Sequence, residues 1–359
     1  MSANSWFKTA VTERFLRYVS IDTQSDRSSS AVPSTPGQTE LLDMLHRELE
    51  ELGISDIQRI EGAYLIARIG ASSPSLEQLQ PIGFMAHVDT ASDVSGRGVQ
   101  PQVIRNYNGS DITLGTTQLV LSPREHQGLA DCVGKDIITT DGTTLLGADD
   151  KAGVAEIMTA VESLIHTPGM EHGPLEVIFT TDEETGRGMD RFPVERLSSV
   201  FCCTLDGTGR GCVEAECFHA LKADVLCKGV SYHLGDARGR MVNALSMAGS
   251  LLNMIPRSES PEATDGRYGY YCPLNMEGTL ESASLEVFIR DFDREEALRR
   301  IKVLEQIGSA VEAAYPGGTV QVQSQWQYEN MLVGISKDER ILEILQDALS
   351  RLNIPVHRT

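Results

Sequence analysis

Four short apolar stretches of this 359-residue chain each end in acidic residues or in a histidine. The stretches are 82–86, 145–148, 177–181 and 200–205, and the residues that follow them are HVD, DD, DEE and DG. Because the carboxyl ends of parallel strands meet at one edge of an open α/β sheet, we expect the four clusters to converge there. Carboxylates gathered in one crevice repel each other unless cations neutralise them. One imidazole with several carboxylates therefore predicts a metal site that suits zinc, with manganese or cobalt as alternatives.

Each cluster taken alone also has a purely structural interpretation. A histidine and an aspartate after a strand usually form a structural hydrogen bond, and an Asp-Asp pair before a helix usually caps it. An Asp-Glu-Glu sequence is typical of a solvated acidic turn, and Leu-Asp-Gly is typical of an ordinary turn. The joint occurrence of all four clusters at strand ends favours a metal site over these interpretations.

The segments between the clusters are expected to alternate between helices and strands. Thr35, Pro36 and Gln38 have the pattern of a helix start, with a threonine N-cap, a proline at the first position and a glutamine closing a capping box. Leucines at 3-4-3 spacing then give this helix one apolar face, and Gly53 ends it. A second helix is expected at about 151–165. Short apolar strands separated by helices predict an α/β fold, with a mostly parallel sheet and flanking helices that bury both of its faces.

After Asp206 the pattern predicts a different arrangement. The expected elements are a strand at 220–227, a helix at 241–255, strands at 268–280 and 283–292, a helix at 294–314 and a strand at 319–325. The order β-α-β-β-α-β is that of a compact two-layer module, which we expect to be inserted into the first domain. The predicted domains are a metal-binding catalytic domain at 1–210, the inserted domain at 211–325, and the return of the catalytic domain at 326–359.

Composition and charge exclude several classes of function. The chain has 31 Lys and Arg against 51 Asp and Glu, a net charge of −20, which argues against nucleic acid or an anionic membrane surface as partner. A membrane-spanning helix is not expected, because there is no apolar run of roughly 18 residues. The residues 1–22 lack the apolar core of a secretion signal. The 7 cysteines form no CxxC pair, so a disulfide framework is not expected, and reduced thiols in the cytoplasm fit better.

Several stretches resemble the peptidase T family, the tripeptide aminopeptidase branch of the co-catalytic di-zinc exopeptidases. They are RFLRYVSIDTQS (14–25), VPSTPGQ (32–38), HVDT (87–90), TTDGTTLLGADDKAG (139–153), TDEETGRG (181–188), LDG (205–207), MVNALS (241–246) and FIRDFDR (288–294). The resemblance runs from about residue 10 to the end. It implies a zinc exopeptidase-like fold whose inserted domain is a lid that closes on a short peptide substrate and excludes water. In some relatives this domain forms the dimer contact, so a monomer and a homodimer both stay open.

The resemblance implies a role for most residues of the four clusters. One zinc ion would be bound by His87, Asp149 and Asp206. Asp149 would bridge to a second zinc ion, which Glu184 would also bind. Glu183 would be the general base that takes a proton from the water between the ions and returns it to the leaving amine. Two such cations, about 3.5–4 Å apart, lower the pKa of the water and polarise the scissile carbonyl.

Further roles implied by the resemblance concern positioning and substrate binding. Asp89 would stand behind His87 and orient it, and the peptide bond between Asp149 and its neighbour Asp150 is expected to be cis. His233 would reach toward the scissile carbonyl, although the family usually has His-Pro-Gly where this chain has His-Leu-Gly. The structural alternative for His233 is a solvated loop histidine.

Two more residues of the inserted domain are candidates for substrate contacts. Arg290 would hold the C-terminal carboxylate of the peptide, since a guanidinium suits bidentate binding. Its structural alternative is a surface ion pair with Asp291 or Asp293. Asn243 would contact the substrate, and its structural alternative is to cap a helix.

The family pattern continues beyond the last residue of this sequence. A further strand, a Gly-Gly-Thr-Asp-Gly loop and a late histidine that completes the second zinc site have no counterpart here, and His357 is expected to be a solvated tail residue. The first zinc would keep its ligands, whereas the second would keep only Asp149 and Glu184 and bind more loosely. We expect either a piece of a longer active enzyme or a natural product that has lost efficient catalysis.

The sequence therefore predicts a metal-dependent aminopeptidase that releases the N-terminal residue from tripeptides by means of a metal-activated water. The alternative is a truncated, catalytically weak or inactive peptidase T-like fragment or pseudoenzyme that binds one metal ion. A third interpretation keeps the enzyme class but changes the substrate to dipeptides or acylated amino acids, because related exopeptidases share the metal ligands. The peptidase T stretches make this third interpretation the least favoured.

Overall fold

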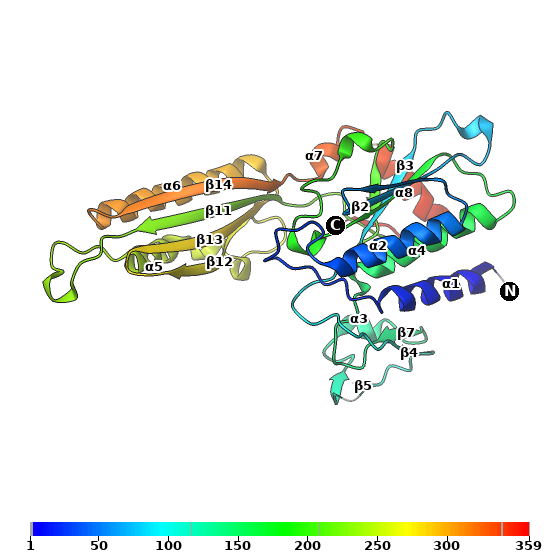
Figure 1. The fold of residues 1–359 in the computed structure, drawn as a ribbon, viewed down its shortest axis with the longest axis horizontal. Coiled ribbons are helices and arrows are strands. Elements are labelled where there is room, and N and C mark those ends of the chain that lie inside the picture. The colour runs from blue at the N-terminus through cyan, green and yellow to red at the C-terminus, as the bar shows by residue number, and fades with distance from the viewer. Residues whose placement is uncertain (1–2, 116, 208, 339, 359) are drawn as a thin grey trace. The chain divides into compact units, whose positions relative to one another are not determined.

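A five-stranded sheet organises the first of the two units into which the chain divides (Figure 1). The structure, a computed structural model, describes residues 3–115, 117–207, 209–338 and 340–358, and its units are Met1–Gly207 and Thr208–Thr359. The strand order is β1-β2-β8-β3-β9, with β1 Asp56–Ile60, β2 Tyr64–Ile69, β8 Leu175–Thr180, β3 Ile82–His87 and β9 Cys202–Thr204. Strand β3 is parallel to β8 and β9, whereas β1, β2 and β8 pair antiparallel. The α/β class is confirmed, but the sheet is mixed instead of mostly parallel, because two of its four strand pairings are antiparallel. The parallel strands lead into the clusters at His87, Asp182 and Asp206, whereas residues 145–148, which were expected to be a strand, lead directly into a helix at Asp149.

Three helices cover one face of this sheet. They are α1 Ala3–Tyr18, α2 Pro36–Glu51 and α4 Ala148–His166, which share a hydrophobic core with β2, β3 and β8. The predicted apolar face of α2 is buried, with Leu42, Leu45 and Leu49 fully inaccessible to solvent. Within the described part of this unit, the opposite face packs against loop residues such as Val32 and Phe192 instead of a second layer of α-helices.

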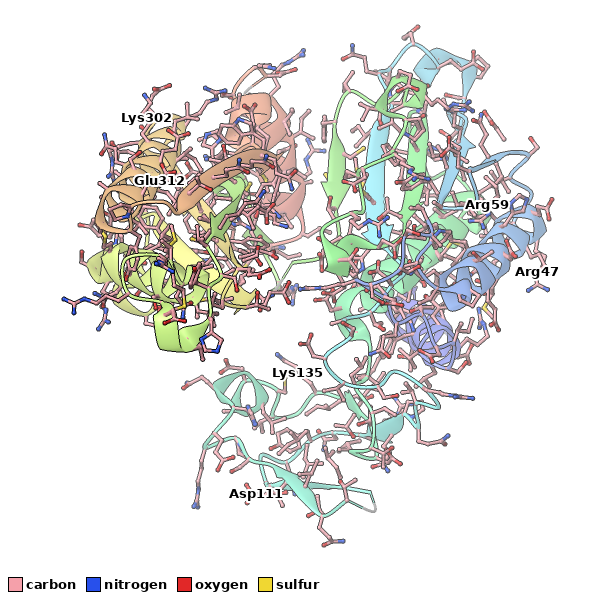
Figure 2. The ribbon with its side chains drawn as sticks, turned by 60° about the vertical axis from the view of Figure 1, so that its left-hand side comes forward. Arg47, Arg59, Asp111, Lys135, Lys302 and Glu312 are labelled. Carbon is pink, nitrogen blue, oxygen red and sulfur yellow. The ribbon has the colours of Figure 1, made fainter. Side chains whose placement is uncertain are left out.

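The chain between β3 and α4 forms a small subdomain that the sequence did not predict. It contains two antiparallel strand pairs, β4 Gln102–Ile104 with β7 Ile137–Thr139 and β5 Ile112–Leu114 with β6 Leu119–Leu121, together with α3 Gln127–Ala130. Figure 2 shows this part of the ribbon, which carries the labelled Asp111 and Lys135. Its core is small and includes Tyr107. Strands of three residues are too short to show a repeating apolar pattern, which is why they escaped prediction.

The second unit contains the predicted two-layer module. Its elements are β11 His219–Lys228, α5 Ala244–Met254, β12 Tyr270–Gly278, β13 Ser282–Asp291, α6 Arg294–Ala314 and β14 Thr319–Tyr328. The four strands form an antiparallel sheet in the order β12-β13-β11-β14. Alternate residues of β11 and β13 face α5 and α6 in one hydrophobic core, as the period of two in a half-buried strand requires. The predicted element order is confirmed.

The C-terminal segment is grouped with the second unit. It contains α7 Leu332–Ile335, α8 Arg340–Arg351 and β15 His357–Arg358, which pairs parallel with β10 Cys212–Val213. The exposed His357 therefore lies in a short strand. The division at residue 207 is close to the expected boundary at 210, and the return of 326–359 to the first domain stays a prediction. Among the described residues, no helix has the length and apolar character needed to cross a membrane.

Candidate metal centre

Three of the predicted metal ligands meet at the carboxyl edge of the parallel strands. Strand β3 ends at His87, α4 begins one residue before Asp149, and Asp206 follows β9. One ligand atom from each residue lies within 4.8 Å of the others. The Nε2 atom of His87 is 2.9 Å from an Asp149 carboxylate oxygen and 3.8 Å from an Asp206 carboxylate oxygen. The sheet thus brings together side chains that are far apart in the sequence, as parallel strands predict.

The two glutamates lie in the turn after β8. Because His87 pairs with Thr180 at the end of β8, the following 3-10 turn Glu183–Thr185 begins beside the histidine. The Glu183 carboxylate comes within 3.9 Å of His87 Nε2. Glu184 is half-buried and is not part of the close group formed by the other three ligands among the described residues. Its role as a ligand of a second ion stays a prediction.

Asp89 holds this turn and the histidine at the same time. Its side chain is completely buried, and one carboxylate oxygen lies 3.3 Å from His87 Nδ1. Its two oxygens also accept hydrogen bonds from the backbone N–H groups of Glu183 and Glu184, at 3.0 and 3.1 Å. A buried carboxylate is costly unless it is hydrogen-bonded, so this network fixes the position of all three neighbours.

Asp149 and Asp150 have different roles, because Asp150 holds the backbone and Asp149 faces His87. The peptide bond that joins them is cis, as expected. The buried Asp150 accepts hydrogen bonds from the backbone N–H groups of His87 and Gly153, at 3.1 and 3.2 Å, so it caps α4 and holds the end of β3. Gly153 must be glycine, because a Cβ there would lie 2.2 Å from the carbonyl oxygen of Leu205. Asp149 is thereby left free to face His87.

The charges of the cluster shift the protonation of its members. Burial lowers the pKa of His87, but the neighbouring carboxylates of Asp149 and Asp89 outweigh burial and raise this pKa to about 11. The hydrogen bond with His87 lowers the pKa of Asp149 in turn. Burial raises the pKa of Asp206 to about 6 and the pKa of Asp150 to about 8. A proton on His87 thus balances part of the negative charge at this edge of the sheet.

The donor set fits a divalent cation. It offers one imidazole nitrogen and several carboxylate oxygens, which are the donors that zinc takes in proteins. A metal ligand must be deprotonated, so a metal ion and a proton compete for Nε2 of His87. The contact between Asp89 and Nδ1 is the arrangement that usually orients a metal-binding imidazole. The residues at this site are therefore suited to a metal ion.

The sequence missed one part of the site, the link between the turn and the start of α2. The side chain of Thr35 makes no capping hydrogen bond, so the predicted capping box is wrong. Gln38 instead donates a hydrogen bond of 2.8 Å to the buried Asp182 and accepts one of 3.0 Å from the backbone N–H of Asp182. Ser34 also donates to this carboxylate, from its N–H and from its hydroxyl. The only sequence signal was that the VPSTPGQ and TDEETGRG stretches both match the same family.

Two of the predicted substrate-binding residues lie at the starts of helical segments in the second unit. His233 precedes the 3-10 turn Leu234–Asp236, its Nδ1 accepts a hydrogen bond from the N–H of Gly235 at 3.2 Å, and its side chain is 82% exposed. Asn243 is the N-cap of α5, where its side-chain oxygen accepts a hydrogen bond of 2.9 Å from the N–H of Leu245. The structural alternative for Asn243, helix capping, is confirmed.

The third candidate, Arg290, is buried in β13. Its contacts are the backbone carbonyls of Leu221 and Ile289 and the aromatic rings of Phe288 and Tyr328. The neighbouring acids are engaged elsewhere, because Asp291 pairs with Arg300 and Asp293 caps α6. The surface ion pair that was the alternative for Arg290 is therefore not formed among the described residues.

Comparison with known proteins identifies the family of this chain. The chain is 43% identical to a peptidase T of Bacillus licheniformis over 348 residues, which cover 97% of this chain and 84% of the relative. It is 42% identical to a peptidase T of Caldanaerobacter subterraneus over 345 residues, which cover 96% and 84%. The chain belongs to the peptidase T family.

Solved structures share the fold of this peptidase T family member. An aminopeptidase PepT from Bacillus cereus superposes with a TM-score of 0.72 at 19% identity, covering 98% of this chain and 84% of that one. A tripeptidase from Staphylococcus aureus gives 0.74 at 18% identity, covering 98% and 83%. A dinuclear metal-binding peptidase of the M20 family from Bacillus subtilis gives 0.61 at 13% identity, covering 99% and 83%. Residues 217–319, which run from before β11 to the first residue of β14, match the model of the peptidase dimerisation domain.

Proposed function

We propose that this member of the peptidase T family is a metal-dependent aminopeptidase that releases the N-terminal residue from tripeptides. The observation that carries the proposal is the convergence of His87, Asp149 and Asp206 within 4.8 Å, beside Glu183 on a turn anchored by Asp89. This arrangement occurs in a chain that is 43% identical to a peptidase T over 97% of its length. Geometry and family thus point to the same chemistry.

The proposed metal is zinc, bound through His87, Asp149 and Asp206, with Asp149 and Glu184 available to a second ion. Bound zinc ions supply a water of lowered pKa and polarise the scissile carbonyl. The buried Asp89 contributes by keeping the imidazole of His87 in one orientation, since it lies 3.3 Å from Nδ1. The imidazole of His87 is therefore held in place before a metal binds.

Glu183 is proposed as the general base. Burial raises the pKa of its carboxyl group, which brings it closer to neutral pH and so improves its ability to accept and return a proton. Its backbone N–H donates a hydrogen bond of 3.0 Å to the carboxylate of Asp89, which fixes the backbone from which the Glu183 side chain extends toward His87. The proton taken up on this carboxylate is returned to the leaving amine.

The second unit is proposed to supply the substrate contacts. His233 would act on the scissile carbonyl, Arg290 would bind the C-terminal carboxylate of the peptide, and Asn243 would be a further substrate contact. The match of residues 217–319 to a dimerisation domain supports a homodimer as the assembly. A cytoplasmic location is proposed because all seven cysteines are free thiols.

The proposal is tested by assaying metal-stripped protein with a tripeptide that has a free amino terminus. Addition of zinc, cobalt or manganese is expected to restore release of the N-terminal residue, and a chelator is expected to abolish it. An N-acetylated tripeptide and a dipeptide are the controls for substrate class. No metal-dependent release from any of the three would refute the proposed activity, whereas preference for the dipeptide would change its substrate.

A further inference from the structure

A second buried carboxylate, in addition to Asp89, holds the glutamate turn. Asp182 immediately precedes Glu183, and only 1% of its surface is exposed. Its carboxylate accepts hydrogen bonds from the N–H and hydroxyl of Ser34 and from the side-chain amide of Gln38. Gln38, which is itself completely buried, accepts a hydrogen bond from the backbone N–H of Asp182 at 3.0 Å. Residues at the start of α2 therefore form hydrogen bonds with both the side chain and the backbone of Asp182.

Asp182 is also the point at which the backbone changes direction. It has φ 59° and ψ 26°, in the left-handed region that side chains other than glycine rarely adopt. Its carbonyl accepts hydrogen bonds from the Thr185 hydroxyl at 2.9 Å and from the Arg187 N–H at 3.0 Å. This conformation directs the next two residues, Glu183 and Glu184, toward Asp89. A strained residue of this kind persists only where its surroundings hold it.

Gln38 gives up a favourable local role in order to hold Asp182. Gln38 stands where the side-chain oxygen of a capping-box glutamine would accept from the backbone at the start of α2, yet this oxygen accepts from the backbone N–H of Asp182. Its amide donates to the carboxylate of Asp182 as well as to the Thr35 hydroxyl. Proteins break local sequence rules of this sort chiefly at functional sites. The network is therefore better explained by the demands of the turn than by the stability of α2.

We propose that Asp182 is a positioning residue, which with Ser34 and Gln38 sets the direction of the turn that carries Glu183 and Glu184. The inference rests on the proposed aminopeptidase function, and it deepens that function by adding a second anchor for the general base. The two anchors act differently: Asp89 binds the N–H groups of the glutamates themselves, whereas Asp182 fixes the backbone dihedrals that precede them. Together they fix the backbone from which the Glu183 carboxylate extends.

The test compares isosteric changes at two buried carboxylates of the same strand region. Asp182→Asn keeps the shape of the side chain, and asparagine tolerates the left-handed backbone. The new NH2 group, however, replaces one acceptor oxygen by a donor that faces the donor groups of Ser34 and Gln38. Glu176→Gln is the matched control, because Glu176 is equally buried at the other end of β8 and accepts backbone N–H bonds from Ser198 and Ser199. Asp182→Ala removes all the acceptors at once.

The expected result is a fall in kcat with little change in KM, since only the base turn is displaced. We expect about a tenfold loss for Asp182→Asn and about a hundredfold loss for Asp182→Ala, the size that a displacement of about 1 Å can cause. Glu176→Gln is expected to lower the melting temperature while leaving kcat within about twofold. Combining Ser34→Ala with Asp182→Ala is expected to cost no more than Asp182→Ala alone, because both cut the same contact. Equal loss of kcat in Asp182→Asn and Glu176→Gln would overturn the inference.

Metal titration tests the same residue without turnover. Calorimetry with cobalt on the metal-free variants is expected to show binding weakened by about tenfold or more in Asp182→Ala, because Glu184 is displaced with the turn, and unchanged binding in Glu176→Gln. An inactive but metal-binding wild type would refute the proposed function and leave this comparison to decide the role of Asp182. If the wild type is active, and Asp182→Ala keeps both the wild-type kcat and the same cobalt affinity as Glu176→Gln, Asp182 has a purely structural role.

Discussion

The candidate residues of the two units are held in opposite ways. In the first unit, Asp89 and Asp182 are buried, and each of their carboxylate oxygens accepts a hydrogen bond from a neighbouring segment. In the second unit, His233 lies on a loop with 82% of its side chain exposed. Asp89 and Asp182 are placed before any ligand arrives, whereas His233 contacts neighbouring residues of its own loop, the backbone N–H of Gly235 and the carboxylate of Asp236.

This difference reflects the work proposed for each set. Binding a cation and moving a proton require carboxylates at fixed separations, and buried hydrogen-bond networks provide that order because an unpaired buried group is costly. Contacts to a substrate that enters and leaves are commonly placed on loops carried by a rigid scaffold. Arg290 is intermediate, because it is buried in a strand, and its side chain donates hydrogen bonds to the backbone carbonyls of Leu221 and Ile289.

The largest effect is expected from Glu183→Gln in the first unit. Loss of the base should lower kcat by about 10²–10⁴, the usual contribution of general acid–base catalysis, with an unchanged melting temperature. Steady-state kinetics and thermal unfolding measure the two quantities. The control is Glu156→Gln, the same change at an exposed position of α4. Retention of wild-type kcat by Glu183→Gln would remove Glu183 from the mechanism.

His233→Ala should lower activity nearly as much but for a different reason. If His233 stabilises the developing oxyanion, kcat should fall by about 10²–10³. Because the side chain is exposed, stability should change by less than about 0.5 kcal/mol. Leu234→Ala, at an adjacent residue that is 74% exposed, is the control. Equal kinetics for the two variants would leave His233 as a solvated loop residue.

Asp89→Ala should affect activity and stability together, unlike a change at the exposed His233. Its removal leaves the N–H groups of Glu183 and Glu184 without their acceptor, at a cost of about 1–3 kcal/mol per buried group. Metal affinity should fall by about 10–100-fold as His87 loses its orienting partner. Urea unfolding and metal analysis report the two effects. Loss of stability without loss of metal affinity would confine Asp89 to a structural role.

The smallest effect is expected from Asn243, whose capping role is visible. Asn243→Ala should lower the stability of the second unit by about 1 kcal/mol, and Asn243→Asp, which keeps the acceptor for Leu245, should not. Urea unfolding of both variants measures the loss of the cap, and their KM values measure the loss of a substrate contact. If both variants raise KM to the same extent, the side-chain amide itself binds substrate.

Much of this arrangement was predictable because it follows from local patterns. The apolar stretches before His87 and Asp206 predicted parallel strands, and the common edge of those strands then predicted the cluster. The module β11–β14 was predicted in its element order because its strands and helices are long enough to show their periods. The small subdomain around Tyr107 was missed because its strands have only three residues.

The amino-acid sequence by itself determined which side chains arrive at the carboxyl edge of the sheet, since strand direction and side-chain period are properties of a few consecutive residues. The tertiary structure alone decided which of them became anchors. Gln38 has a satisfactory local use as a helix cap, and only the approach of Asp182 from a segment more than a hundred residues away turned its amide elsewhere. A buried carboxylate takes whichever donors reach it, and which donors reach it is a property of the packed chain.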